Sequence, residues 1–219
     1  MPSSTLLHQI LQHPNVHFLL REINENLEFE AIKRRQFREM ITEQQKAEFI
    51  NGEVLLHSPV MKRHSDASGF LYALLLHYAV QKKLGYVGHE KLMIALSRND
   101  YEPDVCFWKQ ERASQFTEEQ MLFPAPDFVA EVLSKSTEKN DREVKFVDYA
   151  AHGVQEYWMV DPRKMRIERY RNEEGVFVEA GVFELDERIE SLVVSGFSVA
   201  VEAIFEPTAY SAALQNLLK

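Results

Sequence analysis

The segment Pro126-Asp-Phe-Val-Ala-Glu-Val-Leu-Ser134 decides how this chain folds. Its β-branched and aromatic residues predict a strand, and the side chains of a strand alternate between two faces. Asp127, Val129 and Glu131 therefore share one face, and the apolar residues between them share the other. Glu131 thus interrupts a largely apolar strand. A buried carboxylate is costly unless a cation or hydrogen bonds compensate it, so the pattern predicts a partner for this side chain.

A second acid occupies a similar position in Glu102-Pro-Asp-Val-Cys-Phe-Trp108. Pro103 can begin a strand but cannot lie in its middle, and a β-prone run follows it. Asp104 is therefore expected where this strand begins. Neighbouring strands lie about 4.8 Å apart, so carboxylates from paired strands can bind one hard cation. Asp104 and Glu131 together predict a site for Mg²⁺ or Mn²⁺.

Several segments, taken in order, resemble a known family. They are Glu48-Phe-Ile-Asn-Gly-Glu-Val54, Ser58-Pro59 with His64 shortly after, Pro103-Asp104, the run 126–137, Asp141, Lys145, Tyr149, Gly153-Val154 and Glu156-Tyr-Trp-Met-Val-Asp-Pro162. The series resembles the PD-(D/E)xK nuclease superfamily and, more closely, its Uma-two family of restriction-type endonucleases. The resemblance covers about residues 40 to 205. It implies an α/β fold with a restriction endonuclease-like core, in which helices flank a central mixed β-sheet.

The chain departs from the superfamily pattern at one position. The lysine expected two residues after Glu131 is replaced by Leu133. The resemblance implies that Lys145 takes its place from the following helix. That helix is predicted independently of the family, since Asp141 can begin it and Gly153 can end it. Spacing alone leaves open whether Lys145 reaches the metal.

The resemblance implies metal-dependent hydrolysis of phosphodiester bonds, with DNA as the substrate. Asp104 would be the central ligand and Glu131 the second ligand of Mg²⁺ or Mn²⁺, and the backbone carbonyl of Val132 would complete the protein's share. Mg²⁺ keeps several waters, so two carboxylates suffice. Lys145 would orient the attacking water and stabilise the developing charge. Glu48 is a further candidate acid, and its alternative is an exposed residue before a turn.

Other candidate residues have structural interpretations. His64 could contact a phosphate or a metal-bound water, or it could simply lie at the start of a helix. Tyr149, Tyr157 and Trp158 could stack on bases, but their spacing before a strand favours core packing. Cys106 fits a small core position on the Asp104 strand.

Charge argues against a general nucleic-acid-coating protein. The formal net charge is -9, with 34 acidic residues against 25 lysines and arginines. Duplex-binding proteins usually present a strongly basic surface, so contact with DNA would depend on local basic clusters meeting on one face. Such clusters are Lys33, Arg34, Arg35 and Arg38; Lys62 and Arg63; Lys135, Lys139 and Arg142; and Arg163, Lys164, Arg166, Arg169 and Arg171. The alternative is that each cluster is a solvated surface.

Length and patterning predict one domain preceded by a helical extension. A chain of 219 residues with 45% hydrophobic residues can bury one sizeable core. Residues 1–40 are predicted as an N-terminal helical extension, broken near Pro14, and residues 41–219 as the restriction endonuclease-like domain. Beyond the acidic strands, we expect strands at 53–57, 90–97 and 156–161, a helix at 64–84 ended by Gly85, a hairpin formed by 165–171 and 176–180, and a closing segment at 191–205.

Location and partners follow from the same features. The apolar stretch 70–80 is too short to span a bilayer, and the N-terminus lacks a secretory signal. With one cysteine, the chain suits a reducing compartment, so a cytoplasmic protein without a membrane partner is expected. Duplex cleavage requires two active sites related by a two-fold axis, which predicts a homodimer.

A second hypothesis, which makes the chain a binding protein and not an enzyme, stays open. In it, a nuclease-fold protein with a weak or inactive site acts as a binding or scaffold partner. The trio Asp104, Glu131 and Lys145 favours the endonuclease, whereas the acidic balance and the lack of a recognisable DNA-reading module favour the binding protein.

Overall fold

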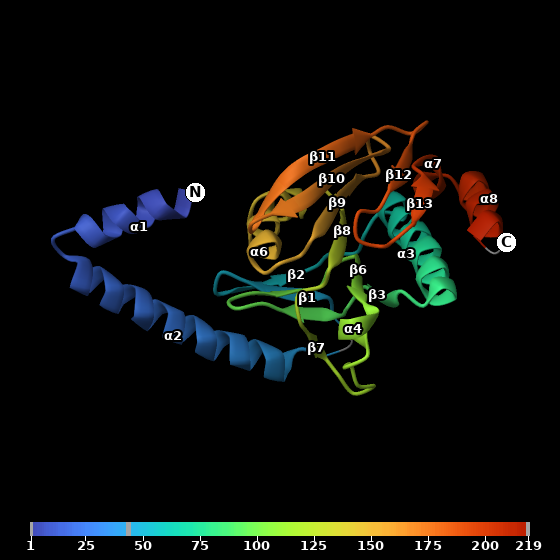
Figure 1. The fold of residues 1–219 in the computed structure, drawn as a ribbon. Helices are drawn as coiled ribbons and strands as arrows, with labels where there is room; N and C mark the ends of the chain where they lie inside the picture. Colours follow the sequence, from blue (N-terminus) through green and yellow to red (C-terminus); the bar gives the residue numbers. More distant parts are fainter. Residues whose placement is uncertain (1, 43–44, 218–219) are drawn as a thin grey trace.

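The two acidic segments lie side by side in a six-stranded sheet (Figure 1). This is seen in the computed structural model, which describes residues 2–42 and 45–217. The order of the sheet is β11-β10-β9-β8-β6-β3. Its strands are β3 (Gly85–His89), β6 (Val105–Lys109), β8 (Phe128–Val132), β9 (Glu156–Asp161), β10 (Arg166–Glu173) and β11 (Val176–Phe183). Strand β8 pairs antiparallel with β6 and parallel with β9, so the central sheet is mixed, as predicted.

The alternation of β8 separates two hydrophobic clusters. Phe128 and Ala130 belong to the cluster that includes α3 (Lys62–Lys82). Val129 belongs to a second cluster on the opposite face, which includes Tyr149 of α6 (Val144–Ala151). Helices therefore pack on both faces of the sheet, and Glu131 faces the side of α6.

A second sheet of the described chain has five strands in the order β2-β1-β5-β4-β7. They are β1 (Ala47–Ile50), β2 (Glu53–Leu56), β4 (Met93–Ala95), β5 (Asp100–Tyr101) and β7 (Leu122–Phe123). Strands β1 and β2 form a hairpin that turns at Asn51 and Gly52, whose φ angles are 51° and 85°. Asn-Gly is the pair that favours such a tight turn. This sheet brings β1 and β2 beside α6 and β8 (Figure 1).

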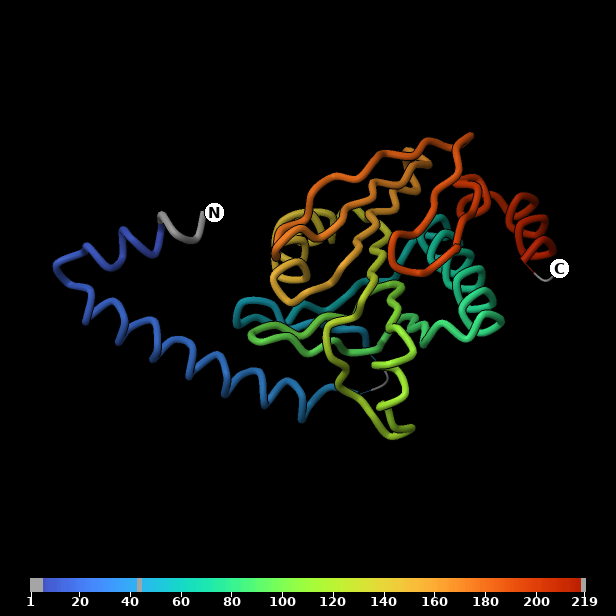
Figure 2. Tube along the Cα trace, viewed as in Figure 1, coloured from blue at the N-terminus to red at the C-terminus, as the bar shows by residue number. Residues whose placement is uncertain are grey.

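The N-terminal helices are α1 (Pro2–Gln12) and α2 (Val16–Met40), so the predicted break near Pro14 is confirmed. The end of α2 packs on the five-stranded sheet. Phe37 is buried with its ring centroid 5.8 Å from that of Phe49, and Arg34 and Arg38 both pair with buried Asp100. The rest of α2, together with α1, extends away from the body of the protein (Figure 2).

The C-terminal segment completes the cluster around α3. It contains α7 (Glu202–Phe205), α8 (Pro207–Leu217) and a two-stranded sheet of β12 (Arg188–Glu190) and β13 (Ser198–Ala200). Apolar side chains from this segment, among them Phe197 and Ile204, are fully buried with those of α3. The expected hairpin is present as β10 and β11, which pair antiparallel. The short helices α4 (Gln110–Ala113) and α5 (Glu138–Arg142) connect the remaining strands.

Two predictions about element boundaries are wrong. Helix α3 ends at Lys82, and Gly85 begins strand β3, which the sequence reading missed. The strand is hard to recognise because it contains Gly88, where an added Cβ would lie 2.4 Å from a side-chain carbon of Leu92. The strand expected at 90–97 is confined to Met93–Ala95.

Asp141 does not begin the helix that carries Lys145. It lies in the preceding short helix, α5, and α6 starts at Val144 after a break at Glu143. The Asp141 side chain is turned toward Lys145, four residues later, and α6 begins without a side-chain capping hydrogen bond. None of the described helices has the length and apolarity that crossing a bilayer requires.

A cluster of charged side chains joins α5 to the six-stranded sheet. Both nitrogens at the end of Arg142 donate to Glu168 on β10, at 2.6 and 2.9 Å. Arg166 and the Tyr170 hydroxyl each donate to the same carboxylate at 3.0 Å. The hydrogen bonds from Arg142 come first among the causes that lower the pKa of Glu168 to about 2.

The Glu168 cluster predicts an acid-sensitive part of the stability. The pKa is lowered from an ordinary value of 4.5 to about 2, so the stabilisation is complete above pH 4.5 and disappears as pH falls toward 2. Glu168→Gln should therefore lower the free energy of unfolding at pH 7 by an amount that shrinks between those two pH values. Urea denaturation across this range measures the difference. The exposed Glu179→Gln is the matched control, and an equal loss at every pH would contradict the prediction.

Candidate active site

The two predicted carboxylates meet at the end of one strand pair. Val105 lies opposite Ala130 in the antiparallel ladder of β6 and β8, which places Asp104 opposite Glu131 one step further along. The Val132 N–H donates to Asp104 Oδ2 at 2.9 Å, and the Asp104 N–H donates to Glu131 Oε2 at 3.3 Å. Asp104 is only 4% exposed and Glu131 only 3%. The structure therefore brings both acids together beside the backbone of Val132.

Lys145 reaches the same place from α6. Its Nζ lies 2.9 Å from Glu48 Oε1, 3.1 Å from Glu131 Oε1 and 3.2 Å from Asp141 Oδ1. The side chain is 2% exposed. A lysine is buried this deeply only when anions surround it, and here three carboxylates do so. The structure thus places Lys145 against Glu131, and its reach to a metal stays a prediction.

Glu48 is part of this cluster and not an exposed acid before a turn. It lies on β1 with 1% exposure, and its Oε1 accepts a hydrogen bond from the Glu102 N–H at 2.9 Å. His57 Nε2 on the other side is 3.1 Å from Glu48 Oε2. The alternative interpretation of Glu48 is therefore wrong.

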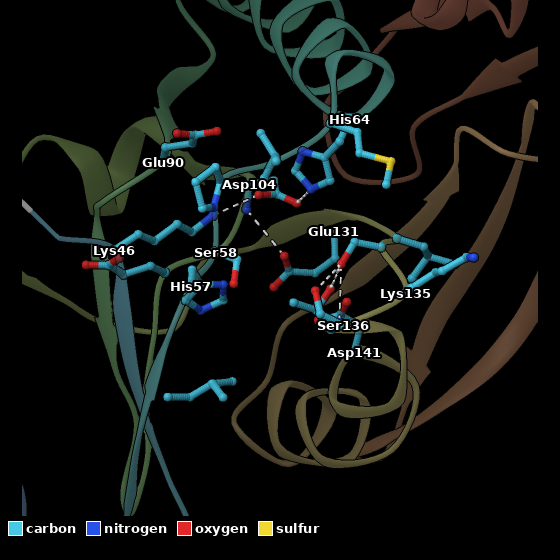
Figure 3. Close-up of a pocket in the computed structure, with 18 of the residues that line it drawn as sticks. Lys46, His57, Ser58, His64, Glu90, Asp104, Glu131, Lys135, Ser136 and Asp141 are labelled. Atoms are coloured by element: carbon cyan, nitrogen blue, oxygen red, sulfur yellow. Dashed lines mark hydrogen bonds and ion pairs between the residues drawn. The ribbon is translucent and has the colours of Figure 1, made fainter.

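Asp104 has a lysine and a histidine as neighbours of its own. Lys46 Nζ lies 2.9 Å from Asp104 Oδ1, and His64 Nε2 lies 3.3 Å from Asp104 Oδ2. His64 is in the first turn of α3, so it both lies at the start of a helix and faces the acid. Figure 3 shows Lys46 and His64 approaching Asp104 from different elements.

The sequence reading missed several residues of this cluster. They are Lys46, His57, Glu102 and Asp141. A signal existed for three of them. Side chains two apart on a strand share a face, which relates Lys46 to Glu48 and Glu102 to Asp104, and Asp141 lies four residues before Lys145, the spacing of neighbours on one helix face. His57 had no comparable signal, since only tertiary packing brings it to Glu48.

Negative groups outnumber positive ones in the cluster. Within the described residues it contains five buried acids, Glu48, Glu102, Asp104, Glu131 and Asp141, but only two lysines, Lys46 and Lys145. Burial raises the pKa of Glu131 to about 8, and repulsion from Asp141, Asp104 and Glu48 adds to the effect although Lys145 opposes it. Burial also raises the pKa of Glu102 to about 7 and the pKa of Asp141 above its usual range.

The remaining two acids are held in the charged form. Burial would raise the pKa of Glu48, but Lys145 and His57 more than offset it and the pKa is about 2. Burial acts on Asp104 in the same way, and His64 and Lys46 bring its pKa well below the usual range. The two lysines thus compensate only part of the negative charge, and Glu131 shares Lys145 with Glu48 and Asp141.

These residues fit a divalent cation. The cluster buries five acids against two lysines, so its excess of acidic side chains calls for further positive charge. In residues 2–42 and 45–217 no set of three or more His, Cys, Asp or Glu side chains already has the geometry of metal ligands. Two carboxylates and a carbonyl are enough for Mg²⁺, which keeps several of its waters.

The cluster opens into a cleft of about 630 Å³. Asp104, Glu131 and Asp141 line its inner part, with Glu131 at the centre of the view in Figure 3. The cleft is also lined by Arg63 and Lys135, which are both exposed. Two exposed cations therefore lie among the residues that line the cleft, and Glu90 lines it as well.

The comparisons with known proteins assign this chain to a family. The family model Uma2, described as "Putative restriction endonuclease", matches residues 34–202. The chain belongs to this family.

Two uncharacterized proteins of Synechocystis are similar to this Uma2 member. One is 33% identical over 130 residues, which cover 58% of this chain and 72% of the relative. The other is 28% identical over 174 residues, which cover 77% of this chain and 87% of the relative.

A crystal structure described as a putative nuclease from Anabaena variabilis shares the fold. Its TM-score is 0.67 at 18% sequence identity, and the match covers 81% of this chain and 96% of that one. The predicted family and the predicted α/β fold are thus confirmed, and the roles of the individual residues stay predictions.

The site predicts opposite effects of two substitutions on stability without added metal. Lys145→Met would leave three buried carboxylates without their shared cation, so we expect the free energy of unfolding to fall by about 3–5 kcal/mol. Glu131→Gln keeps the shape of the side chain and leaves Glu48 and Asp141 beside Lys145, so we expect a change within about 1 kcal/mol. Urea denaturation at pH 7 with a chelator measures both. Equal destabilisation by the two variants would contradict this reading of the cluster.

Proposed function

We propose that this chain is a metal-dependent endonuclease that hydrolyses phosphodiester bonds of DNA. The observation that carries the proposal is the meeting of Asp104 and Glu131 across adjacent strands, with Lys145 against Glu131 at 3.1 Å. Membership of a family described as "Putative restriction endonuclease" supports the same conclusion. Restriction endonuclease-like families generally use divalent metals, and the acid excess of the cluster is consistent with that chemistry.

Asp104, Glu131 and the Val132 carbonyl would hold Mg²⁺ or Mn²⁺. When bound, the ion supplies a water that loses its proton near neutral pH and positive charge for the developing phosphorane. The chain itself fixes the two carboxylates in position. The Val132 N–H holds Asp104, and the Asp104 N–H holds Glu131, so each ligand is oriented by the backbone next to the other.

Lys145 acts as a fixed positive charge and not as a base. Its three carboxylate neighbours outweigh burial and raise its pKa well above the usual value, so the amine keeps its protons at neutral pH. Such a group can orient an attacking water and stabilise negative charge on the scissile phosphate. Glu48 and Asp141 then serve to position the lysine, since both contact its Nζ.

The exposed cations at the edge of the cleft would bind the DNA backbone. Arg63 and Lys135 line the cleft beside the acidic cluster. With a net charge of -9, the chain would be repelled from DNA elsewhere, so binding is confined to this edge and weakens as salt is added.

Cleavage of supercoiled plasmid tests the proposed reaction. With Mg²⁺ or Mn²⁺ we expect nicked and linear products from the native chain. Asp104→Asn and Glu131→Gln should each lower the rate by at least about a hundredfold, because each removes a ligand of the ion. The exposed Glu118→Gln, outside the cleft, should cut like the native chain. Equal background in all four proteins would overturn the proposal.

Lys46 competes with the metal for Asp104 in this account. Its Nζ lies 2.9 Å from Asp104 Oδ1, and it carries a charge of the same sign as the metal. Lys46→Met should therefore raise the affinity for Mn²⁺ on the order of tenfold, measured by calorimetric titration. Lys135→Met, which removes an exposed lysine from the cleft edge, is the matched control and should leave the affinity unchanged. A weaker affinity in Lys46→Met would instead assign Lys46 to holding the metal's waters.

The same contact favours a second candidate function. If Lys46 and His64 compensate Asp104 permanently, the site stays closed to metal and the protein acts as a nuclease-fold binding or scaffold partner. That protein would bind Mn²⁺ weakly in its native form and would leave plasmid intact.

A further inference from the structure

The N-terminal helices expose an unusual amount of apolar surface. We define the arm as residues 6–29, which extend away from the body formed by residues 45–217 (Figures 1 and 2). Its large apolar side chains are 42% to 64% exposed, and they are Leu6, Leu7, Leu11, Phe18, Leu20, Ile23, Leu27 and Phe29. Exposed apolar side chains gathered in one segment point to an interaction site.

One stripe of the arm has a regular pattern. Val16, Leu20, Ile23 and Leu27 follow one another at spacings of four, three and four residues, which is the pattern of a helix-pairing seam. The positions that flank the seam on either side carry no charged aspartate, glutamate, lysine or arginine. They are His17, Leu19, Asn24 and Asn26. Charges on the exposed half of α2 lie instead on the opposite side of the helix.

Further along α2, the same stripe contacts the body of the protein. At the same helical spacing it continues through Glu30, Arg34 and Phe37, which contact the body: Glu30 pairs with Arg98, Arg34 with Asp100, and Phe37 is buried. The C-terminal half of the stripe therefore packs against the body of its own chain. The apolar N-terminal half, Val16 to Leu27, extends beyond the edge of the body.

We infer that the seam pairs with the seam of a second copy of this chain. The spacing of four, three and four reads the same from either end, so two seams match when the helices run antiparallel, with Leu20 of one copy against Ile23 of the other. A parallel pairing would bring both bodies to the same end of the helix pair, where Glu30 and Arg34 already hold each copy's own body. The antiparallel pair places the bodies at opposite ends.

The size and charge of the arm agree with this occupant. Pairing of the two seams buries Leu20, Ile23 and Leu27, which are 42% to 44% exposed in the single chain. DNA and anionic membranes are disfavoured occupants, because the exposed half of α2 carries Glu22, Glu25 and Glu28 against Arg21 alone. The association itself does not depend on the nuclease proposal. If that proposal holds, pairing gives the two active sites that duplex cleavage requires.

The arm lies outside the part of the chain that the family model matches. The family model begins at residue 34, after the seam has ended. The seam substitutions below lie on side chains that the single chain leaves 42% to 43% exposed, so they should leave the fold of the body intact.

Sedimentation velocity on the full chain tests the inference over a range of protein concentrations. We expect the native chain to sediment with twice the chain mass of 25.5 kDa. Leu20→Glu combined with Ile23→Glu should weaken the association at least tenfold and leave the thermal unfolding of the body unchanged. Glu22→Gln combined with Glu25→Gln, on the opposite side of α2, is the matched control and should stay dimeric.

Two results would overturn the inference. A native chain that sediments as a monomer at every concentration would show that the arm does not self-associate. A dimer that persists in the Leu20→Glu, Ile23→Glu chain would place the interface elsewhere. Neither result depends on cleavage, so failure here is distinguishable from failure of the nuclease proposal.

Discussion

The ion cluster around Lys145 is the interaction on which the rest of the structure depends. One buried ammonium group holds carboxylates from β1, β8 and α5, and it belongs to α6. These elements come from both sheets and from the helices between them. A buried lysine without these anions, or these anions without the lysine, would carry a desolvation cost of several kcal/mol. The contact of the two sheets and the shape of the cleft therefore follow from a charge requirement.

The same requirement explains why the site suits a metal. The lysines compensate only part of the buried acid, and burial raises the pKa of Glu131 although Lys145 opposes the shift. The excess of buried acids over lysines lowers the stability of the folded chain. Such an excess is typical of sites whose ligand supplies the missing positive charge. Stability and function thus place opposite demands on Glu131.

The sequence predicted the parts of the site that local periodicity encodes. Alternation in β8 and the proline before β6 were sufficient for Asp104 and Glu131, because both positions depend only on strand pairing. His57 could not be found in this way, since its partner Glu48 lies on another element. Asp141 lies four residues before Lys145, a spacing that relates the two side chains on one helix face. Strand β3 was missed because Gly88 makes room for Leu92 and gives no strand signal. The division at residue 40 between extension and domain stays a prediction.

Mn²⁺ binding, followed by electron paramagnetic resonance of the free ion, tests the central claim most directly. The account holds that Asp104 and Glu131 together bind one divalent ion beside Lys145. It predicts saturable binding of Mn²⁺ to the native chain that is lost when Asp104→Asn and Glu131→Gln are combined, with the fold intact by circular dichroism. Binding of the same strength in the native and double-variant chains would contradict the account, because the ion would then lie elsewhere.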